Sequence, residues 1–442
     1  MPTADTDTPL YTRPAELLQR LIRFDTTNPP GNEAACIGYI RDVLAEAGIS
    51  STIVARDPTR PNLVARLAGH GNAPPLLLYG HVDVVTTSGQ QWSHPPFAGD
   101  IADGAVWGRG ALDMKGGIAM MLAAFLRAAA EDTALPGDVI FAALSDEENW
   151  GDDGARFLVE EHADLFQGVR YALGELGGFT AHIAAQRFYP IMVAEKQGVA
   201  ITATVRGPGG HGSLPMRGGA MAKTGQLLQR LDQHRLPPHI PTVTRLMIEG
   251  IADALPPQIG ELIRPLLDPA HTDATLDLLG AQGATFDPLL HNTVNATMVR
   301  GGEKANVIPS EIVVQLDGRM LPGSTPDEML AELRQLAGDL AECSAGRSDP
   351  IAAEPDMALF DTLAAILREA DPDGTPIPLL LSGCTDGRYF SRLGIQTYGF
   401  LPMNLPADFA MPELIHAADE RVPVEAVHFG TEAIYQALCR FQ

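Results

Sequence analysis

Residues 76–85 read LLLYGHVDVV, an apolar run typical of a buried strand that two polar side chains interrupt. His81 and Asp83 stand two positions apart, and alternate residues of a strand point to the same face, so both can serve one site. Taken alone, the pair fits a hydrogen-bonded core histidine as well as it fits a functional site. The choice between the two depends on the rest of the chain.

The size and charge of the chain limit its class. With 442 residues it is too long for one ordinary core, which predicts two domains or one large insertion. The 55 acidic and 31 basic residues give a net charge of −24, which disfavours nucleic acid and membrane surfaces as partners. Neither a signal peptide nor a membrane span is expected. Four widely spaced cysteines fit a reducing environment, so we expect a cytoplasmic protein.

The pattern of apolar residues changes along the chain. Strand-like runs alternate with helix-like segments over residues 1–191, which predicts an α/β domain built on a layered sheet. Near Met192 alternating strands replace the buried runs, and we interpret residues 192–348 as an inserted α+β domain. Residues 349–442 are expected to complete the first domain. In such sheets ligands bind at the carboxyl ends of strands, where His81 and Glu147 stand.

Besides His81, the chain contains further carboxylates and a second histidine of the kinds that bind two metal ions in one site. They are Asp113, Glu147, Glu148, Glu175 and His416. Taken singly, each has a structural explanation, such as a turn carboxylate, a solvated acidic turn or a capping histidine. Together they offer oxygen and imidazole ligands without thiolates, which suit zinc, manganese or cobalt in an open catalytic site. Two such metals activate a water between them, and Glu147 would take its proton and pass it to a leaving amine.

Seven motifs then carry a family resemblance. In order along the chain they are GHVDVV, GRGALDMKGG, SDEEN, GHGSLP, NVIPSE, SGCTDGRYF and HAADE. From about Thr26 to Val422 the chain resembles the M20 family of zinc-dependent metallopeptidases and amidohydrolases, which includes glutamate carboxypeptidase, aminoacylase and succinyl-diaminopimelate desuccinylase. The resemblance implies an α/β, mixed-sheet dinuclear metallohydrolase domain with an inserted ferredoxin-like lid or dimerisation domain. The segment between His211 and Asn306 is most similar to the carboxypeptidase S and N-acyl amino acid hydrolase branch.

The same resemblance implies a role for each polar residue. The ligands of one metal would be His81 and Glu175, those of the other Glu148 and His416, with Asp113 bridging the two. Glu147 would act as general base, and Asp83 would hold the free nitrogen of His81 and so fix its tautomer. The expected cofactors are two divalent ions, zinc first, with cobalt or manganese as alternatives.

Candidate substrate contacts come from other motifs. They are His211, Asn306, Arg319 and Thr385. In dimeric members the histidine matching His211 reaches the partner's active site, whereas in a monomer it would be a turn residue. Arg319 could form a bidentate hydrogen-bonded pair with a substrate carboxylate, or it could form a structural ion pair. Cys384 stands where relatives usually have glycine, which affects the expected geometry of the substrate loop.

The expected activity is that of an M20-type carboxypeptidase or aminoacylase. It would cleave an amide bond adjacent to a free carboxylate, in a peptide or an N-acyl amino acid, by a dimetal-bridged water with Glu147 as base. A homodimer through the inserted domain is left open. The alternatives are a dipeptidase or desuccinylase-type deacylase, a non-catalytic binding protein on the same fold, and a phosphoesterase. A complete set of ligands and base disfavours the binding protein, and the missing phosphate-binding loop disfavours the phosphoesterase.

Overall fold

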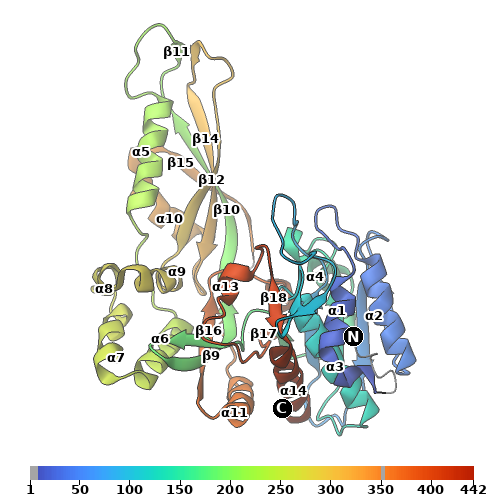
Figure 1. Ribbon diagram of the computed structural model, residues 1–442. Coiled ribbons are helices and arrows are strands. Elements are labelled where there is room, and N and C mark those ends of the chain that lie inside the picture. Colours follow the sequence, from blue (N-terminus) through green and yellow to red (C-terminus); the bar gives the residue numbers. More distant parts are fainter. Residues whose placement is uncertain (1–7, 350–353) are drawn as a thin grey trace. The chain divides into compact units, whose positions relative to one another are not determined.

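The computed structural model describes residues 8–349 and 354–442, which form two compact units (Figure 1). The first unit contains the described residues up to Val193, Asp356–Leu379 and Thr385–Gln442. The second contains those from Ala194 to Pro355, together with Leu380–Cys384. The sequence pattern predicts boundaries at 192 and 349 and places residues 380–384 in the first domain. The structure joins this short segment to the second unit, where the carbonyl of Leu381 accepts a hydrogen bond from the backbone N–H of Lys196 (3.0 Å).

A mixed sheet of nine strands in the described residues forms the centre of the first unit, in the order β1-β2-β6-β3-β7-β17-β9-β16 with β8 beside β9. The strands are β1 (Ser51–Val54), β2 (Asn62–Leu67), β3 (Leu76–His81), β6 (Val139–Leu144), β7 (Tyr171–Gly174), β8 (Ala181–Ile183), β9 (Gln186–Glu195), β16 (Gly374–Leu381) and β17 (Gln396–Gly399). Strand β3 runs parallel to β6 and β7, and β17 runs parallel to β7. The carboxyl ends of these four strands therefore meet at one edge of the sheet.

The first unit contains eight α-helices in the described residues, some of which pack on the two faces of this sheet. They are α1 (Pro14–Ile22), α2 (Ala34–Glu46), α3 (Lys115–Ala130), α4 (Ala155–Glu161), α11 (Phe360–Ala370), α12 (Gly387–Phe390), α13 (Met411–Leu414) and α14 (Val424–Arg440). Helix α3 packs against β3 and β6, with α1 and α14 packed against it (Figure 1). Gly80 of β3 lies under α3, where a Cβ atom would overlap the side chain of Met114. On the other face Tyr79 packs in a cluster with Phe157 of α4 and Phe390 of α12.

A second, smaller sheet belongs to the first unit. Its three strands are β4 (Asp100–Ala102), β5 (Ala105–Trp107) and β18 (Arg421–Pro423), in the order β18-β5-β4. It joins a segment near the C-terminus to the loop that precedes α3. Among the described residues, every helix is too short or too polar to cross a bilayer.

The second unit is built on a four-stranded antiparallel sheet in the order β12-β14-β10-β15. Its elements are β10 (Gln197–Arg206), α5 (Ala220–Gln233), β12 (Thr293–Arg300), β14 (Glu311–Met320), α10 (Pro326–Ala337) and β15 (Glu342–Ser348). This β-α-β-β-α-β succession is that of a ferredoxin-like motif. Apolar side chains from β10 and β14, such as Val205 and Val314, form a core with Leu227 of α5 and Leu333 of α10.

Two insertions extend this motif. A helical segment between α5 and β12 contains α6 (Thr242–Ala254), α7 (Pro257–Ile263), α8 (Thr272–Leu279) and α9 (Asp287–Leu290). Elsewhere β11 (Gly210–His211) pairs with β13 (Val307–Ile308) in a two-stranded sheet. Lys196 anchors the helical segment, because its buried ammonium donates hydrogen bonds to the carbonyls of Pro288 (2.9 Å) and His291 (2.8 Å).

Candidate metal centre

Three parallel strands bring candidate ligands to the same edge of the sheet. His81 is the last residue of β3, and Glu175 directly follows β7. Glu147 and Glu148 lie in the short 3-10 helix Glu147–Asn149, which begins three residues after the last residue of β6. The apolar runs that form these buried strands therefore also determine where the polar residues that follow them lie.

The ligand atoms form two groups that share Asp113, which lies in the loop before α3. Its Oδ1 is 3.1 Å from Nε2 of His81, which is 3.5 Å from Oε2 of Glu175. Its Oδ2 is 3.1 Å from Nε2 of His416, which is 3.2 Å from Oε1 of Glu148. Within each group one ligand atom from each of the three residues lies within 4.8 Å of the others. The carboxylate of Asp113 thus turns one oxygen toward each group.

The charges of the two groups fit divalent cations. Burial raises the pKa values of Glu148 and Glu175. Burial would lower the pKa of His81, but hydrogen bonds led by that to Asp113 raise it well above its usual value. Hydrogen bonds with Asp113 and Glu148 raise the pKa of His416 to about 10. The excess of buried negative charge draws protons onto both imidazoles, and bound cations would supply that positive charge instead.

Glu147 lies beside the two groups and belongs to neither. Burial, followed by the negative charge of Glu175, raises its pKa well above the usual value for a glutamate. The residues on either side of the 3-10 helix, Asp146 (φ 71°) and Trp150 (φ 76°), are left-handed and turn the chain sharply there. A carboxylate in this setting accepts a proton readily, as a general base requires.

Asp83 contacts both His81 and the segment that carries Glu147. The Nδ1 atom of His81 is 3.0 Å from the backbone carbonyl of Asp83 and 3.4 Å from its carboxylate Oδ1. The carboxylate accepts hydrogen bonds from the backbone N–H groups of Glu147 (3.1 Å) and Glu148 (3.2 Å). The nearer partner of the imidazole is therefore the carbonyl, while the carboxylate mainly holds the Glu147–Glu148 backbone.

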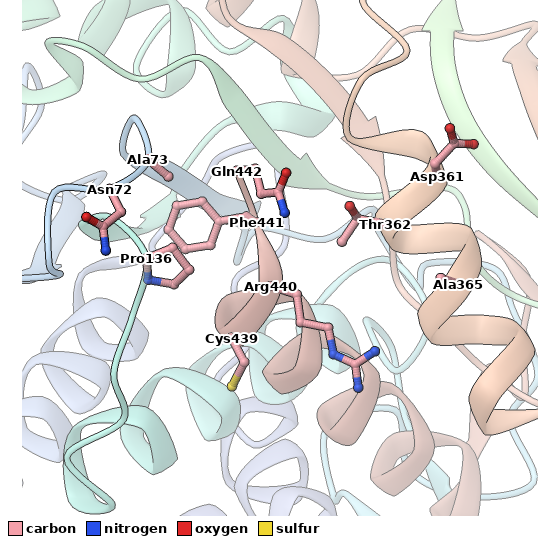
Figure 2. A pocket seen from close by; sticks show the side chains of 10 residues that line it. All are labelled: Asn72, Ala73, Pro136, Asp361, Thr362, Ala365, Cys439, Arg440, Phe441 and Gln442. Atoms are coloured by element: carbon pink, nitrogen blue, oxygen red, sulfur yellow. The ribbon is translucent and has the colours of Figure 1, made fainter.

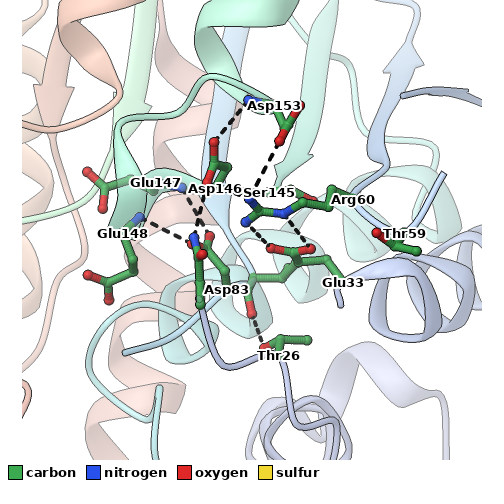
Figure 3. Close-up of polar contacts among 12 residues, drawn as sticks. Thr26, Glu33, Thr59, Arg60, Asp83, Ser145, Asp146, Glu147, Glu148 and Asp153 are labelled. Atoms are coloured by element: carbon green, nitrogen blue, oxygen red, sulfur yellow. Dashed lines mark hydrogen bonds and ion pairs between the residues drawn. The ribbon is translucent and has the colours of Figure 1, made fainter. Parts of the chain in front are cut away.

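A buried ion-pair network lies beside this backbone and supports it (Figure 3). Arg60 donates to Oε1 of Glu33 (2.8 Å) and to Oδ1 of Asp146 (2.7 Å). Asn28 donates to Asp146 (3.1 Å) and to Asp83 (2.8 Å). All five side chains are less than 10% exposed. The sequence pattern did not indicate these contacts, since the segment TTNPPGNE, which contains Asn28, indicates only an interruption of regular secondary structure.

Replacing Arg60 with methionine is expected to lower the free energy of unfolding by about 3–5 kcal/mol, because two buried carboxylates lose their counter-charge. Urea unfolding followed by circular dichroism measures this change. Arg41→Met is the matched control, since Arg41 forms an exposed pair with Asp42 and should change stability little. Equal stabilities of the two variants would contradict the structural role of Arg60.

Two candidate substrate residues are neighbours in the second unit. His211 lies in β11, and Asn306 directly precedes β13, the strand paired with β11. The backbone N–H of Gly212 donates to the carbonyl of Asn306 (2.8 Å), which joins the two positions. The Nδ1 atom of His211 lies 2.7 Å from the hydroxyl of Ser213. The structure thus brings His211 and Asn306 together, while both metal-ligand groups belong to the first unit.

The other two candidates have partners of their own. Arg319 of β14 donates through Nε to Asp317 (3.1 Å) and through Nη1 to the sulfur of Cys384 (3.0 Å). Thr385 is fully buried in the first unit, and its hydroxyl accepts a hydrogen bond from the backbone N–H of Gly387 (3.0 Å). The side chain of Arg319 remains partly exposed, with 29% of its surface accessible.

Three buried ionisable residues were not predicted as site residues, although each stands in one of the seven sequence motifs. Asp386 lies in SGCTDGRYF, and burial raises its pKa to about 8. Neither oxygen of its carboxylate has a hydrogen-bond partner in the described part of the chain. Arg109 and Glu420, from GRGALDMKGG and HAADE, form a buried ion pair of 2.6 Å. Their positions next to candidate ligands were the available signal.

A separate cavity of about 680 Å³ lies near the C-terminus (Figure 2). Its lining includes Asn72, Pro136, Asp361, Arg440 and Phe441. None of the candidate ligands lines this cavity. Arg440 forms an ion pair with Glu369 (2.7 Å). This cavity therefore has no part in the metal centre.

Known proteins resemble this chain over most of its length. The family model described as Peptidase family M20/M25/M40 matches residues 77–440. A probable carboxypeptidase S-like 2 of Dictyostelium discoideum is 27% identical over 79% of this chain and 68% of its own. The human N-fatty-acyl-amino acid synthase/hydrolase PM20D1 is 26% identical over 82% and 73%. A succinyl-diaminopimelate desuccinylase of Paracoccus denitrificans is 29% identical over 94% of both chains.

Solved structures share the fold. An M20 family metallo-carboxypeptidase of Sulfolobus solfataricus aligns with a TM-score of 0.66 and 17% identity over 98% of this chain and 99% of its own. The YXEP protein of Bacillus subtilis, described as a dinuclear metal binding peptidase of the M20 family, aligns with a TM-score of 0.62 and 14% identity over 97% of both chains. The mixed α/β fold predicted from the sequence is thereby confirmed.

Proposed function

The chain belongs to peptidase family M20/M25/M40, the metal-dependent peptidases and amidohydrolases, and from this we propose that it hydrolyses an amide bond adjacent to a free carboxylate. The observation that carries the proposal is the shared carboxylate of Asp113, with one oxygen toward His81 and the other toward His416. This arrangement suits two divalent ions, zinc by preference, held side by side. Bound there, they would activate a water and stabilise the negative charge that develops on the amide oxygen.

The chain's own residues would move the proton and hold the geometry. Glu147 would accept the proton of the attacking water and return it to the leaving amine. Its raised pKa favours holding that proton between the two transfers. Asp83 would keep Glu147 in place through the backbone N–H of that residue, and would keep Nε2 of His81 turned toward the metal through Nδ1.

Recognition of a substrate carboxylate is assigned to residues of the second unit, while the fourth candidate, Thr385, belongs to the first unit. Arg319, whose side chain remains partly exposed, would bind the carboxylate through its guanidinium. Asn306 and His211 would contact the amide, His211 as the donor to its carbonyl oxygen. Thr385 would contribute to substrate binding by stabilising its own loop, through the hydrogen bond that its hydroxyl accepts from Gly387. The names of two relatives, a carboxypeptidase S-like protein and an N-fatty-acyl-amino acid hydrolase, support substrates with a free carboxylate.

A substrate panel tests this proposal. The purified protein, loaded in turn with zinc, manganese and cobalt, is offered N-acyl amino acids, dipeptides and the same compounds with amidated carboxyl ends. We expect turnover of the free acids and a loss of turnover on amidation. An N-succinyl amine tests the desuccinylase alternative, since a succinyl-diaminopimelate desuccinylase is among the relatives of this chain. Equal turnover of acids and amides would contradict the proposed recognition.

We also propose a homodimer through the second unit. Strand β12 is an edge strand, and its residues from Asn295 to Arg300 are exposed. Exposed apolar side chains lie on it and on the segments near β11 and β13, including Met298, Val299 and Leu214. An exposed edge strand with apolar neighbours is suited to pairing with a second copy.

Val299→Glu is expected to dissociate this dimer, because a carboxylate would be buried at the shared edge. Light scattering after gel filtration should then report 47.1 kDa for the variant and twice that mass for the wild type. Ile53→Glu is the control, since Ile53 is an exposed apolar residue on β1, the edge strand of the other sheet. A monomeric wild type, or a dimer in both variants, would contradict the proposal.

A further inference from the structure

Glu420 holds the loop that carries Asp113. Its carboxylate is fully buried, and Oε1 accepts hydrogen bonds from the backbone N–H groups of Leu112 (2.7 Å) and Asp113 (3.1 Å). Oε2 accepts from the backbone N–H of Gly110 (3.1 Å) and from Nη1 of Arg109 (2.6 Å). These four hydrogen bonds, all accepted by one side chain, position the loop immediately before α3.

Arg109 extends the same contact to His416. Its Nη2 donates to the backbone carbonyl of His416 (3.1 Å) and to Oε1 of Gln90 (2.9 Å). Gln90 in turn donates to the same carbonyl of His416 (2.8 Å). The backbone of His416 is left-handed, with φ at 61°, which is uncommon for a residue other than glycine. Two donors to its carbonyl therefore hold a conformation that the residue would otherwise seldom adopt.

The two groups of ligands depend on this contact to different extents. Asp113 and His416 are two of the three residues in the group that includes Glu148. The other group takes only Asp113 from these segments, and its remaining members stand at the ends of β3 and β7. Disturbing the contact should therefore affect one group more than the other.

We propose that the buried Glu420–Arg109 pair, with Gln90, is a positioning device for the metal held by Asp113, Glu148 and His416. This inference rests on the proposed two-metal function. The pair joins side chains 311 positions apart and sets the backbone of two ligands at once. It does not touch the substrate, and its effect passes through Asp113 and His416.

Glu420→Gln is the direct test, with calorimetric titration of the metal-free protein by zinc as the readout. The carboxamide of glutamine has the same shape as the carboxylate of Glu420, but its NH2 group replaces one oxygen and cannot accept hydrogen bonds. About half of the four contacts are therefore lost. We expect the wild type to bind two equivalents. In the variant one equivalent should bind about 10- to 100-fold more weakly, and the other, which takes only Asp113 from these segments, should weaken less. The absorption spectrum of the cobalt-loaded variant should likewise show one altered ion.

Asp371→Asn provides the matched control. Asp371 is a buried carboxylate of the first unit that accepts from Arg187 (2.6 Å) and from the hydroxyl of Tyr189 (2.7 Å). A merely structural loss should lower stability in both variants, yet Asp371→Asn should retain two equivalents at wild-type affinity. Gln90→Leu, which leaves the ion pair intact, serves if Glu420→Gln does not fold, and should weaken the same equivalent.

The outcomes separate this inference from the proposed function. A wild type that binds fewer than two equivalents would overturn the proposed two-metal function itself. Two equivalents in the wild type, with both affinities retained in Glu420→Gln and Gln90→Leu, would overturn the positioning role alone. Equal weakening of both equivalents would also overturn it, because the proposal assigns the pair to one metal.

Discussion

Replacing Glu147 with alanine is expected to lower kcat by about 10²- to 10⁴-fold, with both metals still bound. The reason is geometric, because Glu147 lies beside the two groups of ligand atoms and contributes to neither. The variant should therefore lose the proton acceptor and keep the ligands. Steady-state kinetics on an N-acyl amino acid, with metal content measured on the same samples, checks both parts of the expectation.

Asn149→Ala is the control for disturbance of the segment. Asn149 ends the same 3-10 helix and is exposed, so its loss should leave kcat close to the wild-type value. Full metal content and unchanged turnover in the Glu147 variant would remove Glu147 from the role of general base. A loss of metal in that variant would instead assign it to the ligands.

Asp113→Ala is expected to abolish activity, with a fall in kcat/KM on the order of 10⁴-fold. Asp113 is the one residue shared by both groups, so its loss takes a ligand from each metal. The variant should bind less than two equivalents of zinc even when zinc is in excess. Elemental analysis after gel filtration and kinetics at saturating zinc measure these effects.

An exposed carboxylate in the same part of the chain supplies the comparison. Asp100 lies in β4 and is exposed, and Asp100→Ala should keep both metals and wild-type activity. Retention of two equivalents by Asp113→Ala would contradict the bridging role. So would a variant that loses metal but keeps its activity.

Much of the first unit could be predicted from the sequence because it follows from apolar periodicity. The runs that form β3, β6 and β7 are buried and parallel, and parallel strands end at the same edge. That rule brings His81 and Glu175 together without further information. Asp113 and His416 lie outside these strands, and the family resemblance was needed to assign each of them to a particular metal. The metals, the dimer and the cytoplasmic location stay predictions.

Contacts between residues far apart in the sequence could not be predicted. Arg60 reaches Asp146 and Arg109 reaches Glu420 across long separations, and no local pattern marks which buried charges pair. Asp83 provides an example of a contact between residues close in the sequence that could not be fully predicted. Its place two residues after His81 indicates a partner for the imidazole, but only the structure shows that the backbone carbonyl is the nearer acceptor.

Helix α3 departs from its expected character for a related reason. The composition of residues 118–130, rich in alanine, leucine and methionine, is that of an amphipathic helix, whereas the structure buries every residue from Ile118 to Leu126. The helix lies between the sheet and the helices α1 and α14, so it presents no broad polar face. Which layer covers a helix is decided by tertiary packing, and the covering helix α14 comes from the far end of the chain.

The central claim is that two metals share Asp113, and anomalous diffraction from crystals grown with zinc tests it most directly. Data collected on both sides of the zinc absorption edge locate each ion without reference to activity. We predict two peaks about 3.5–4 Å apart, one among His81, Asp113 and Glu175 and one among Asp113, Glu148 and His416. A single peak, or peaks that do not contact Asp113, would contradict the account.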